Sequence, residues 1–389
     1  SSSSAAAASS STTTTTTSLS VLQRRMRACV GKAAETEAAA SAIGGRRVPD
    51  GVRRGGVAVV TGATRGIGKG IAIGLAEIGM KVYITGRTVA EKDNPTREDG
   101  VGGSLEATKA MIEKAGGTCV PVRVDHSSDE EIRAFYERVA SEEGHIDVLV
   151  NNAYSAVDSL ADTIGTPFWE KPTEMWDEVN KVGLRSHYIS TVLAAPLLIK
   201  SPRTNGTPLV VHVSSLGGLT YIFDVAYGVG KAAVDRMAGD MAEEFLPEGV
   251  SVVSLWPGLV KTEKMSSAIG KLAAASNLEG AESPVFVGRA VAALASSGNL
   301  MERTGTIQAV EDIATEFGFT DEEGKVPPSF RSVKALASAG GKTSPITNAI
   351  PQSIKLPWWL LKLFTKPMPR FSRPIVSPEN GRRTDKNDD

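Results

Sequence analysis

The sequence predicts a single α/β domain built on an open, doubly wound parallel sheet of seven strands, with helices on both faces. Short, continuous apolar runs alternate along the chain with amphipathic segments, as is typical of strands buried on both faces of a parallel sheet. A glycine-rich turn joins the first run to the first helical segment, which is typical of the same class. The expected strands are residues 57–60, 81–85, 119–124, 148–150, 209–213, 250–256 and 306–310.

Length and charge bound the class of protein. The chain has 389 residues and a net charge of −1, so nothing favours nucleic acid as a partner. Its two cysteines, Cys29 and Cys119, predict no disulfide and fit a reducing compartment. The histidines are scattered without the spacing of metal ligands, and we predict no metal site.

The expected domain spans residues 56–320 and follows a leader, residues 1–55. The leader is rich in Ser, Ala and Thr, carries Arg24 and Arg25, and has no acidic residue before Glu35. This composition indicates an organelle transit peptide and favours the plastid. The alternatives are a low-complexity tail or a start at Met26, with the protein associated with the endoplasmic reticulum or in the cytoplasm.

A C-terminal extension, residues 321–376, is expected to be helical in part and to precede a disordered tail, residues 377–389. It contains an aromatic and leucine cluster around Trp358 and Trp359 that is flanked by lysines and too short to span a bilayer. The cluster either caps its own domain or a partner subunit, or makes peripheral contact with a membrane surface.

The glycine-rich turn predicts a dinucleotide site. Gly62 allows a sharp exit from the first strand, and Gly66 and Gly68 allow the backbone to approach a pyrophosphate. The unpaired N–H groups and the dipole of the following helix favour an anion at that point.

Two arginines favour NADP(H) over NAD(H). Arg87 follows the second strand, where an NAD-specific site carries an acidic residue for the ribose hydroxyls, and Arg65 lies inside the glycine turn. A guanidinium binds a 2′-phosphate, whereas a carboxylate repels it. Either arginine could instead be a solvated surface charge.

Polar residues follow the other strands at the edge where ligands of open α/β sheets bind. Asp125 ends the third strand and Asn152 follows the fourth, although a helix cap and a turn are equally ordinary roles for them. Pro257-Gly258 and Thr262 follow the sixth strand, where Thr262 could bind the nicotinamide carboxamide.

Tyr227 and Lys231 lie one helical turn apart, so that both side chains face the same way. A phenol has a pKa of about 10, and a neighbouring ammonium is expected to lower it towards neutral pH, where acid–base catalysis works best. Ser214 or Ser215, at the end of the fifth strand, could hydrogen-bond a substrate carbonyl. Neighbouring strand residues point to opposite faces, and we favour Ser214.

Taken in order, Thr61-Gly-x-x-x-Gly-x-Gly68, Asn151-Asn-Ala153, the strand-end serine, Tyr227-x-x-x-Lys231 and Pro257-Gly-x-x-x-Thr262 resemble the short-chain dehydrogenase/reductase superfamily of Rossmann-fold enzymes. The resemblance implies that Tyr227 donates and accepts the proton, that Lys231 lowers its pKa and holds the nicotinamide ribose, and that Ser214 orients the carbonyl. The cofactor contacts we expect are Gly62, Thr64, Arg65, Gly66, Ile67, Gly68, Arg87, Asp125, Asn152, Tyr227, Lys231, Pro257, Gly258, Val260 and Thr262.

The sequence departs from the family pattern at two positions. Tyr154 stands where many members have a glycine after Asn-Asn-Ala, and it could crowd or line the substrate mouth. Gly183 stands where many members have an asparagine that anchors a proton relay to the lysine. Asn180 lies three residues earlier, and we do not assign it that role.

These features predict an NADPH-dependent carbonyl reductase that also works as an alcohol dehydrogenase on a small-molecule substrate. The alternatives are a plastid reductase of 3-oxoacyl thioesters and a non-catalytic NADP-binding regulatory protein. Residues 155–171 and 264–283 are expected to cover an apolar substrate pocket. Relatives suggest a homodimer or homotetramer.

Overall fold

The computed structural model describes residues 56–93, 102–265, 280–334, 351, 354–358 and 360. The predicted leader, the C-terminal tail and Trp359 lie outside the described residues. So do residues 266–279, which form most of the second segment expected to cover the pocket, residues 264–283.

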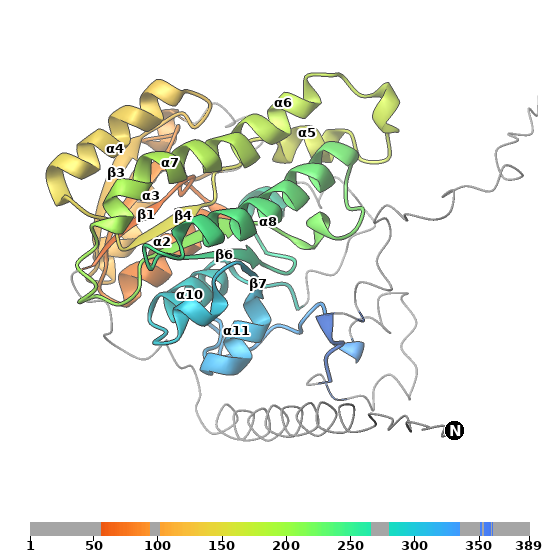
Figure 1. Cartoon of the computed structure of the whole chain (residues 1–389). Coiled ribbons are helices and arrows are strands. Elements are labelled where there is room, and N and C mark those ends of the chain that lie inside the picture. Colours follow the sequence, from red (N-terminus) through yellow and green to blue (C-terminus); the bar gives the residue numbers. More distant parts are fainter. Residues whose placement is uncertain are drawn as a thin grey trace, which may run out of the picture.

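The sheet has seven strands in the order β3-β2-β1-β4-β5-β6-β7, and every neighbouring pair is parallel. The chain builds outward from β1 to β3 and then returns to place β4 against β1, which makes a switch point between these two strands. The predicted fold class is thereby confirmed (Figure 1). The strands are β1 (Val57–Val60), β2 (Lys81–Gly86), β3 (Thr118–Arg123), β4 (Val148–Asn151), β5 (Leu209–Val213), β6 (Ser251–Trp256) and β7 (Thr306–Ala309).

Helices cover both faces of the sheet, which explains the continuous apolar runs in its strands. In β1, Ala58 and Val60 belong to the core formed with α2, α3 and α10, while Val57 and Val59 belong to the core formed with α4, α7 and α8. The helices on the first side are α2 (Gly66–Glu77), α3 (Leu105–Lys114), α10 (Pro284–Ala295) and α11 (Val310–Phe317). Those on the second side are α4 (Asp129–Glu143), α7 (Ser186–Ile199) and α8 (Val225–Phe245).

Short elements lie at the carboxyl end of the sheet. They are the helices α5 (Val157–Asp162) and α6 (Met175–Asn180) and the single turns Phe168–Glu170 and Leu216–Gly218. A π-helical turn, Lys181–Arg185, joins α6 to α7. The resulting stretch Met175–Ile199 is long and apolar enough to cross a membrane by length and composition, yet Ala194 and Leu198 are fully buried in the second core.

The described residues of the C-terminal extension pack on the end of the sheet. The Trp358 ring lies 5.7 Å from that of Trp256 and 6.1 Å from that of Phe330, and the Arg331 guanidinium lies 4.5 Å from the Trp358 centroid. Lys355 donates to Asp312 over 2.7 Å. Trp358 therefore packs on its own domain, and contact of the tryptophan cluster with a membrane or a partner subunit stays a prediction.

Helices α2 and α10 approach so closely that their glycines leave no room for a side chain. A Cβ added at Gly288 would stand 2.0 Å from the carbonyl oxygen of Gly70, and one added at Gly70 would stand 1.9 Å from the carbonyl oxygen of Pro284. Because both obstacles are backbone atoms, the helices would have to separate to admit a methyl group.

We expect Gly288→Ala to lower the free energy of unfolding by roughly 1–3 kcal/mol, because overpacking forces the two helices apart. Gly239→Ala in α8 is the matched control, since a Cβ there meets nothing within 4 Å. That variant should be neutral or stabilised by up to about 1 kcal/mol. Urea unfolding measures both, and equal effects of the two substitutions would contradict the packing argument.

Candidate active site

Every predicted catalytic and cofactor-binding residue lines one cavity of about 1090 Å³. The cavity lies at the carboxyl ends of the parallel strands, where the loops after β1, β4, β5 and β6 converge. Its far side is formed by α5, by the helical turns before α7 and by Phe330 of the C-terminal segment. Residues distant in the sequence are thus brought to a single site.

Tyr227 is held in place by the start of α8. Asp224 caps this helix, and its Oδ1 accepts a hydrogen bond of 2.8 Å from the Tyr227 backbone N–H. The other oxygen of Asp224 accepts from the Lys171 ammonium over 3.1 Å, and both side chains are almost fully buried. An acidic residue three positions before Tyr227 is the ordinary sequence signature of a helix start, and sequence analysis overlooked it.

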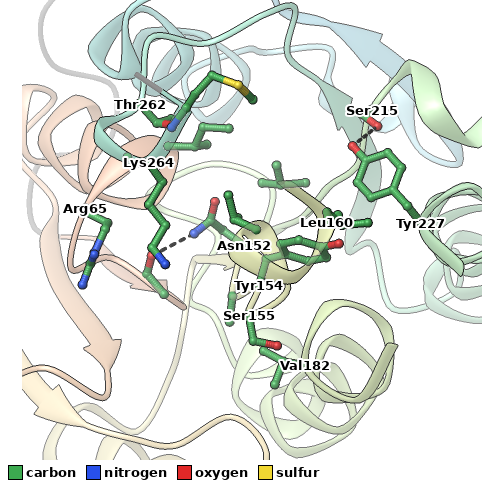
Figure 2. Close-up of a pocket in the computed structure, with 18 of the residues that line it drawn as sticks. Arg65, Asn152, Tyr154, Ser155, Leu160, Val182, Ser215, Tyr227, Thr262 and Lys264 are labelled. Atoms are coloured by element: carbon green, nitrogen blue, oxygen red, sulfur yellow. Dashed lines mark hydrogen bonds between the residues drawn. The ribbon is translucent and has the colours of Figure 1, made fainter. Parts of the chain in front are cut away.

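The serine beside Tyr227 is Ser215, so the prediction of Ser214 is wrong. Ser215 Oγ lies 2.7 Å from Tyr227 Oη (Figure 2), whereas Ser214 Oγ donates over 3.2 Å to the backbone carbonyl of Lys231. Neighbouring residues at the end of β5 point in opposite directions. The turn Leu216–Gly218 directs the second of them towards the tyrosine.

Lys231 is buried behind the tyrosine. Its ammonium donates a hydrogen bond of 3.0 Å to the Val213 carbonyl, and lies 5.9 Å from the ring centroid of Tyr227. Burial lowers the pKa of Lys231 to about 8, although the nearby charge of Asp235 opposes that shift. Asp235 is itself fixed by hydrogen bonds from Ser254 and Trp256.

The expected depression of the Tyr227 pKa by Lys231 is not what the geometry gives. Burial raises the pKa of the Tyr227 phenol, and the hydrogen bond from Ser215 only partly opposes it. The lysine lies over the face of the tyrosine ring, so it contributes less to the hydroxyl than a direct contact would. The Tyr227 hydroxyl is therefore protonated at neutral pH.

Asn152 holds the glycine turn in shape. Its side-chain nitrogen donates to the carbonyls of Thr61 and Gly62 over 2.9 and 3.0 Å, and its backbone N–H donates to Thr61 Oγ1 over 2.9 Å. These bonds tie β4 to the loop after β1. The side chain thus makes the turn contacts that sequence analysis considered as an alternative, while still lining the cavity.

The N-terminus of α2 already binds an anion of the protein itself. The N–H of Gly66 donates over 2.8 Å to a carboxylate oxygen of Glu263, which also pairs with Lys69. Burial alone would raise the Glu263 pKa, but the hydrogen bonds from Lys69 and Gly66 hold it below its usual value. The Glu263 oxygen stands in for a phosphate oxygen, so this turn fits a pyrophosphate.

Asp125 and Arg87 line the cavity just beyond the ends of β3 and β2. Ser127 donates to Asp125 Oδ1 from its backbone and from its hydroxyl, over 2.9 and 2.8 Å. These bonds, with the charge of Arg87, outweigh burial and lower the Asp125 pKa. The cap of α4 is Ser128, so Asp125 is not the helix cap considered as its alternative role.

The loop after β6 rests on two buried carboxyl groups that the sequence did not reveal. Glu282 Oε1 accepts over 2.9 Å from the Gly258 N–H, and Glu311 lies against the same glycine. Burial raises the pKa of both side chains, and the charge of Glu311 adds to the shift of Glu282. Thr262, expected at the nicotinamide, accepts from the Met265 N–H over 3.1 Å.

Comparisons with known proteins point to one family. A family model for short chain dehydrogenase matches residues 56–271. Dehydrogenase/reductase SDR family member 1 of Mus musculus is 39% identical over 321 residues, covering 80% of this chain and 97% of that protein. A 3-oxoacyl-[acyl-carrier protein] reductase of Brucella melitensis in complex with NAD superposes with a TM-score of 0.56 and 25% identity, covering 66% of this chain and 96% of that one. A short chain dehydrogenase of Shigella flexneri complexed with NADP has the same fold, with a TM-score of 0.55 at 21% identity over 67% of this chain and 98% of its own.

The carboxyl pair predicts a dependence of stability on pH. A carboxyl with a raised folded-state pKa keeps a proton that the unfolded chain releases, so its stabilising effect is present below the unfolded pKa of about 4.3 and is lost as pH rises through the folded pKa. We expect the free energy of unfolding to fall by about 1–3 kcal/mol between about pH 5 and about pH 8.

Glu311→Gln should reduce this fall in the free energy of unfolding with rising pH. Glu244→Gln, on the exposed face of α8, should leave the fall unchanged. Urea unfolding at several pH values measures both. A decline as steep in Glu311→Gln as in the wild type would contradict the assignment.

Proposed function

The chain belongs to the short-chain dehydrogenase family, which binds nicotinamide cofactors, and from this premise we propose that it is an NADPH-dependent carbonyl reductase that also oxidises alcohols. The observation that carries the proposal is the contact of 2.7 Å between Ser215 Oγ and Tyr227 Oη inside the predicted cofactor cavity. Lys231 lies behind this pair, as acid–base chemistry on a carbonyl oxygen requires.

The roles of the side chains follow from their positions. A bound nicotinamide supplies the hydride that becomes the new C–H bond of the substrate. Ser215 donates a hydrogen bond to the carbonyl oxygen and stabilises it as negative charge develops. Tyr227 gives its proton to that oxygen, so a C=O bond becomes CH–OH and the tyrosine is left as a phenolate. Lys231, charged at neutral pH, stabilises that phenolate.

The choice of NADPH rests on two arginines. Arg65 and Arg87 both line the cavity, and the charge of Arg87 acts on Asp125. The similar solved structures include complexes with NAD and with NADP, so the arginines decide the proposal. Two guanidinium groups favour a 2′-phosphate over a free ribose hydroxyl.

The substrate end of the cavity is apolar. Its apolar side chains beyond Tyr227 come from α5 and the turn after it, from the loop before α8 and from the segment after β6: Val157, Leu160, Ile164, Ile222, Phe223 and Met265. This lining favours an uncharged ketone or aldehyde with an apolar body. Reduction of a 3-oxoacyl thioester is the second candidate, favoured by the similarity to the Brucella reductase.

An exposed apolar strip supports self-association. Tyr188 and Val192 on α7, with Val225 and Val229 on α8, are each between 42% and 53% exposed. We propose that these helices pair in a homodimer or homotetramer. The plastid address of residues 1–55 stays a prediction.

We expect Tyr227→Phe to lower kcat/KM for carbonyl reduction by about 10²–10⁴-fold, because the proton donor is lost. Ser215→Ala should lower it by roughly 10²–10³-fold through the lost hydrogen bond to the developing oxyanion. Ser214→Ala is the matched control and should keep near-normal activity. The measurement is NADPH oxidation over a panel of aldehydes and ketones. Cofactor binding with equally negligible turnover by wild type and Tyr227→Phe would exclude the enzymatic proposal.

Arg87→Ala and Arg65→Ala should each weaken NADPH binding by roughly tenfold or more while leaving NADH binding nearly unchanged, because each removes a charge-assisted contact to the 2′-phosphate. Fluorescence titration with both cofactors gives the ratio of dissociation constants. Arg236→Ala, on the exposed face of α8, serves as the control for net charge. Tighter binding of NADH by the wild-type protein would remove the NADPH assignment.

A further inference from the structure

Tyr154 and Gly183, the two positions singled out in the sequence, face each other. Gly183 is buried in the π-helical turn that joins α6 to α7. A Cβ added there would stand 2.6 Å from Cδ2 and 2.7 Å from Cε2 of Tyr154. The tyrosine ring therefore lies directly on the bare backbone of Gly183, in space that any other residue at that position would occupy.

The same ring contacts both members of the catalytic helical pair. The Lys231 ammonium lies 5.1 Å from the Tyr154 centroid, closer than to the Tyr227 centroid. The rings of Tyr154 and Tyr227 meet edge to face at 6.3 Å and 86° (Figure 2). Tyr154 thus touches the Gly183 backbone, the ammonium and the proton donor at once.

The ammonium has few other partners where the chain is described. Its one hydrogen bond in this part of the structure goes to the Val213 carbonyl. Asn180 lies three residues before Gly183. Its side-chain nitrogen donates to the Trp176 carbonyl, and its buried Oδ1 has no partner among the described residues. A buried ammonium with a single acceptor is poorly compensated, so the face of an aromatic ring becomes a significant part of its environment.

We propose that Tyr154 is a positioning residue, whose ring is seated on Gly183 and holds the Lys231 ammonium against Tyr227 through a cation–π contact. The proposal deepens the proposed carbonyl reductase function and rests on it. It gives the two departures a single explanation, because the ring fits only while residue 183 has no side chain. The Tyr154 hydroxyl is not needed, and it has no hydrogen-bond partner among the described residues.

The first test separates the ring from the hydroxyl. Tyr154→Phe keeps the aromatic face and should retain wild-type kcat. Tyr154→Leu keeps a buried apolar side chain but removes that face, and it should lower kcat by roughly ten- to a hundredfold by misplacing the ammonium. If the Tyr154→Phe variant loses as much activity as the Tyr154→Leu variant, the ring does not hold the lysine and the proposal fails.

The second test measures the pKa of the Lys231 ammonium directly and does not require catalytic activity. Lys231 is flanked by Asp235 and Tyr227 on its own helix, by Tyr154, and by His187 on α7. NMR titration of the lysine side chains, with the Lys231 signal identified by its absence in Lys231→Met, gives its pKa in each variant. Loss of a cation–π contact disfavours the charged form, so the Lys231 pKa should fall by roughly half a unit to one and a half units in Tyr154→Leu and stay unchanged in Tyr154→Phe.

The Lys231 pKa measurement also distinguishes a failure of the proposed reductase function from a failure of the proposed ring contact. An inactive wild-type protein in which Tyr154→Leu still lowers the Lys231 pKa would contradict the reductase function and leave the ring contact standing. Equal Lys231 pKa values in the wild type and Tyr154→Leu would overturn the ring contact, whatever the activity.

The third test substitutes Gly183, the residue on which the Tyr154 ring lies. Gly183→Ala should displace the ring and reproduce the kcat loss of Tyr154→Leu. Combined with Tyr154→Leu it should add little further loss, since the ring is already gone. Additive losses in the double variant, with thermal unfolding showing that it is folded, would mean that residue 183 acts independently of the ring and would refute the pairing.

Discussion

A parallel sheet covered by helices on both faces leaves the carboxyl ends of its strands open to ligands. All seven strands run the same way, so their carboxyl ends lie together, while most side chains within the strands are apolar and pack under the helices. The cavity, the glycine turn and the serine after β5 follow from this constraint. The site is therefore assembled from loops that are far apart in the sequence, while the sheet fixes their spacing.

Helix α8 carries the buried charges of the site and is anchored along its length. Asp224 caps its first turn and is itself neutralised by Lys171. Lys231 and Asp235 follow on successive turns, and each is compensated by different partners: a strand carbonyl for the ammonium, and Ser254 with Trp256 for the carboxylate. Lys231 and Asp235 make their hydrogen bonds to different partners. Burial can therefore lower the pKa of Lys231 without disrupting the packing of α8 on the sheet.

The parts predicted from sequence are those carried by local patterns. Strand runs, the glycine turn and the Tyr227–Lys231 spacing depend only on neighbouring residues, and the sheet was predicted from them. The choice between Ser214 and Ser215 depends on how the backbone leaves β5, which no local pattern encodes. Glu282 and Glu311 meet only through the packing of β6, α10 and α11. The pKa of Tyr227 depends on burial and ring orientation, so the spacing that identified Lys231 could not give the sign of its effect.

Glu263 gives the start of α2 an anion before any ligand arrives. It accepts from the N–H of Gly66, in the turn that fits a pyrophosphate, and pairs with Lys69 in the first turn of α2. A cofactor that binds there exchanges places with a carboxylate, rather than with water alone. A pyrophosphate that takes the Gly66 N–H would displace the Glu263 carboxylate from it, so the two anions compete for one donor.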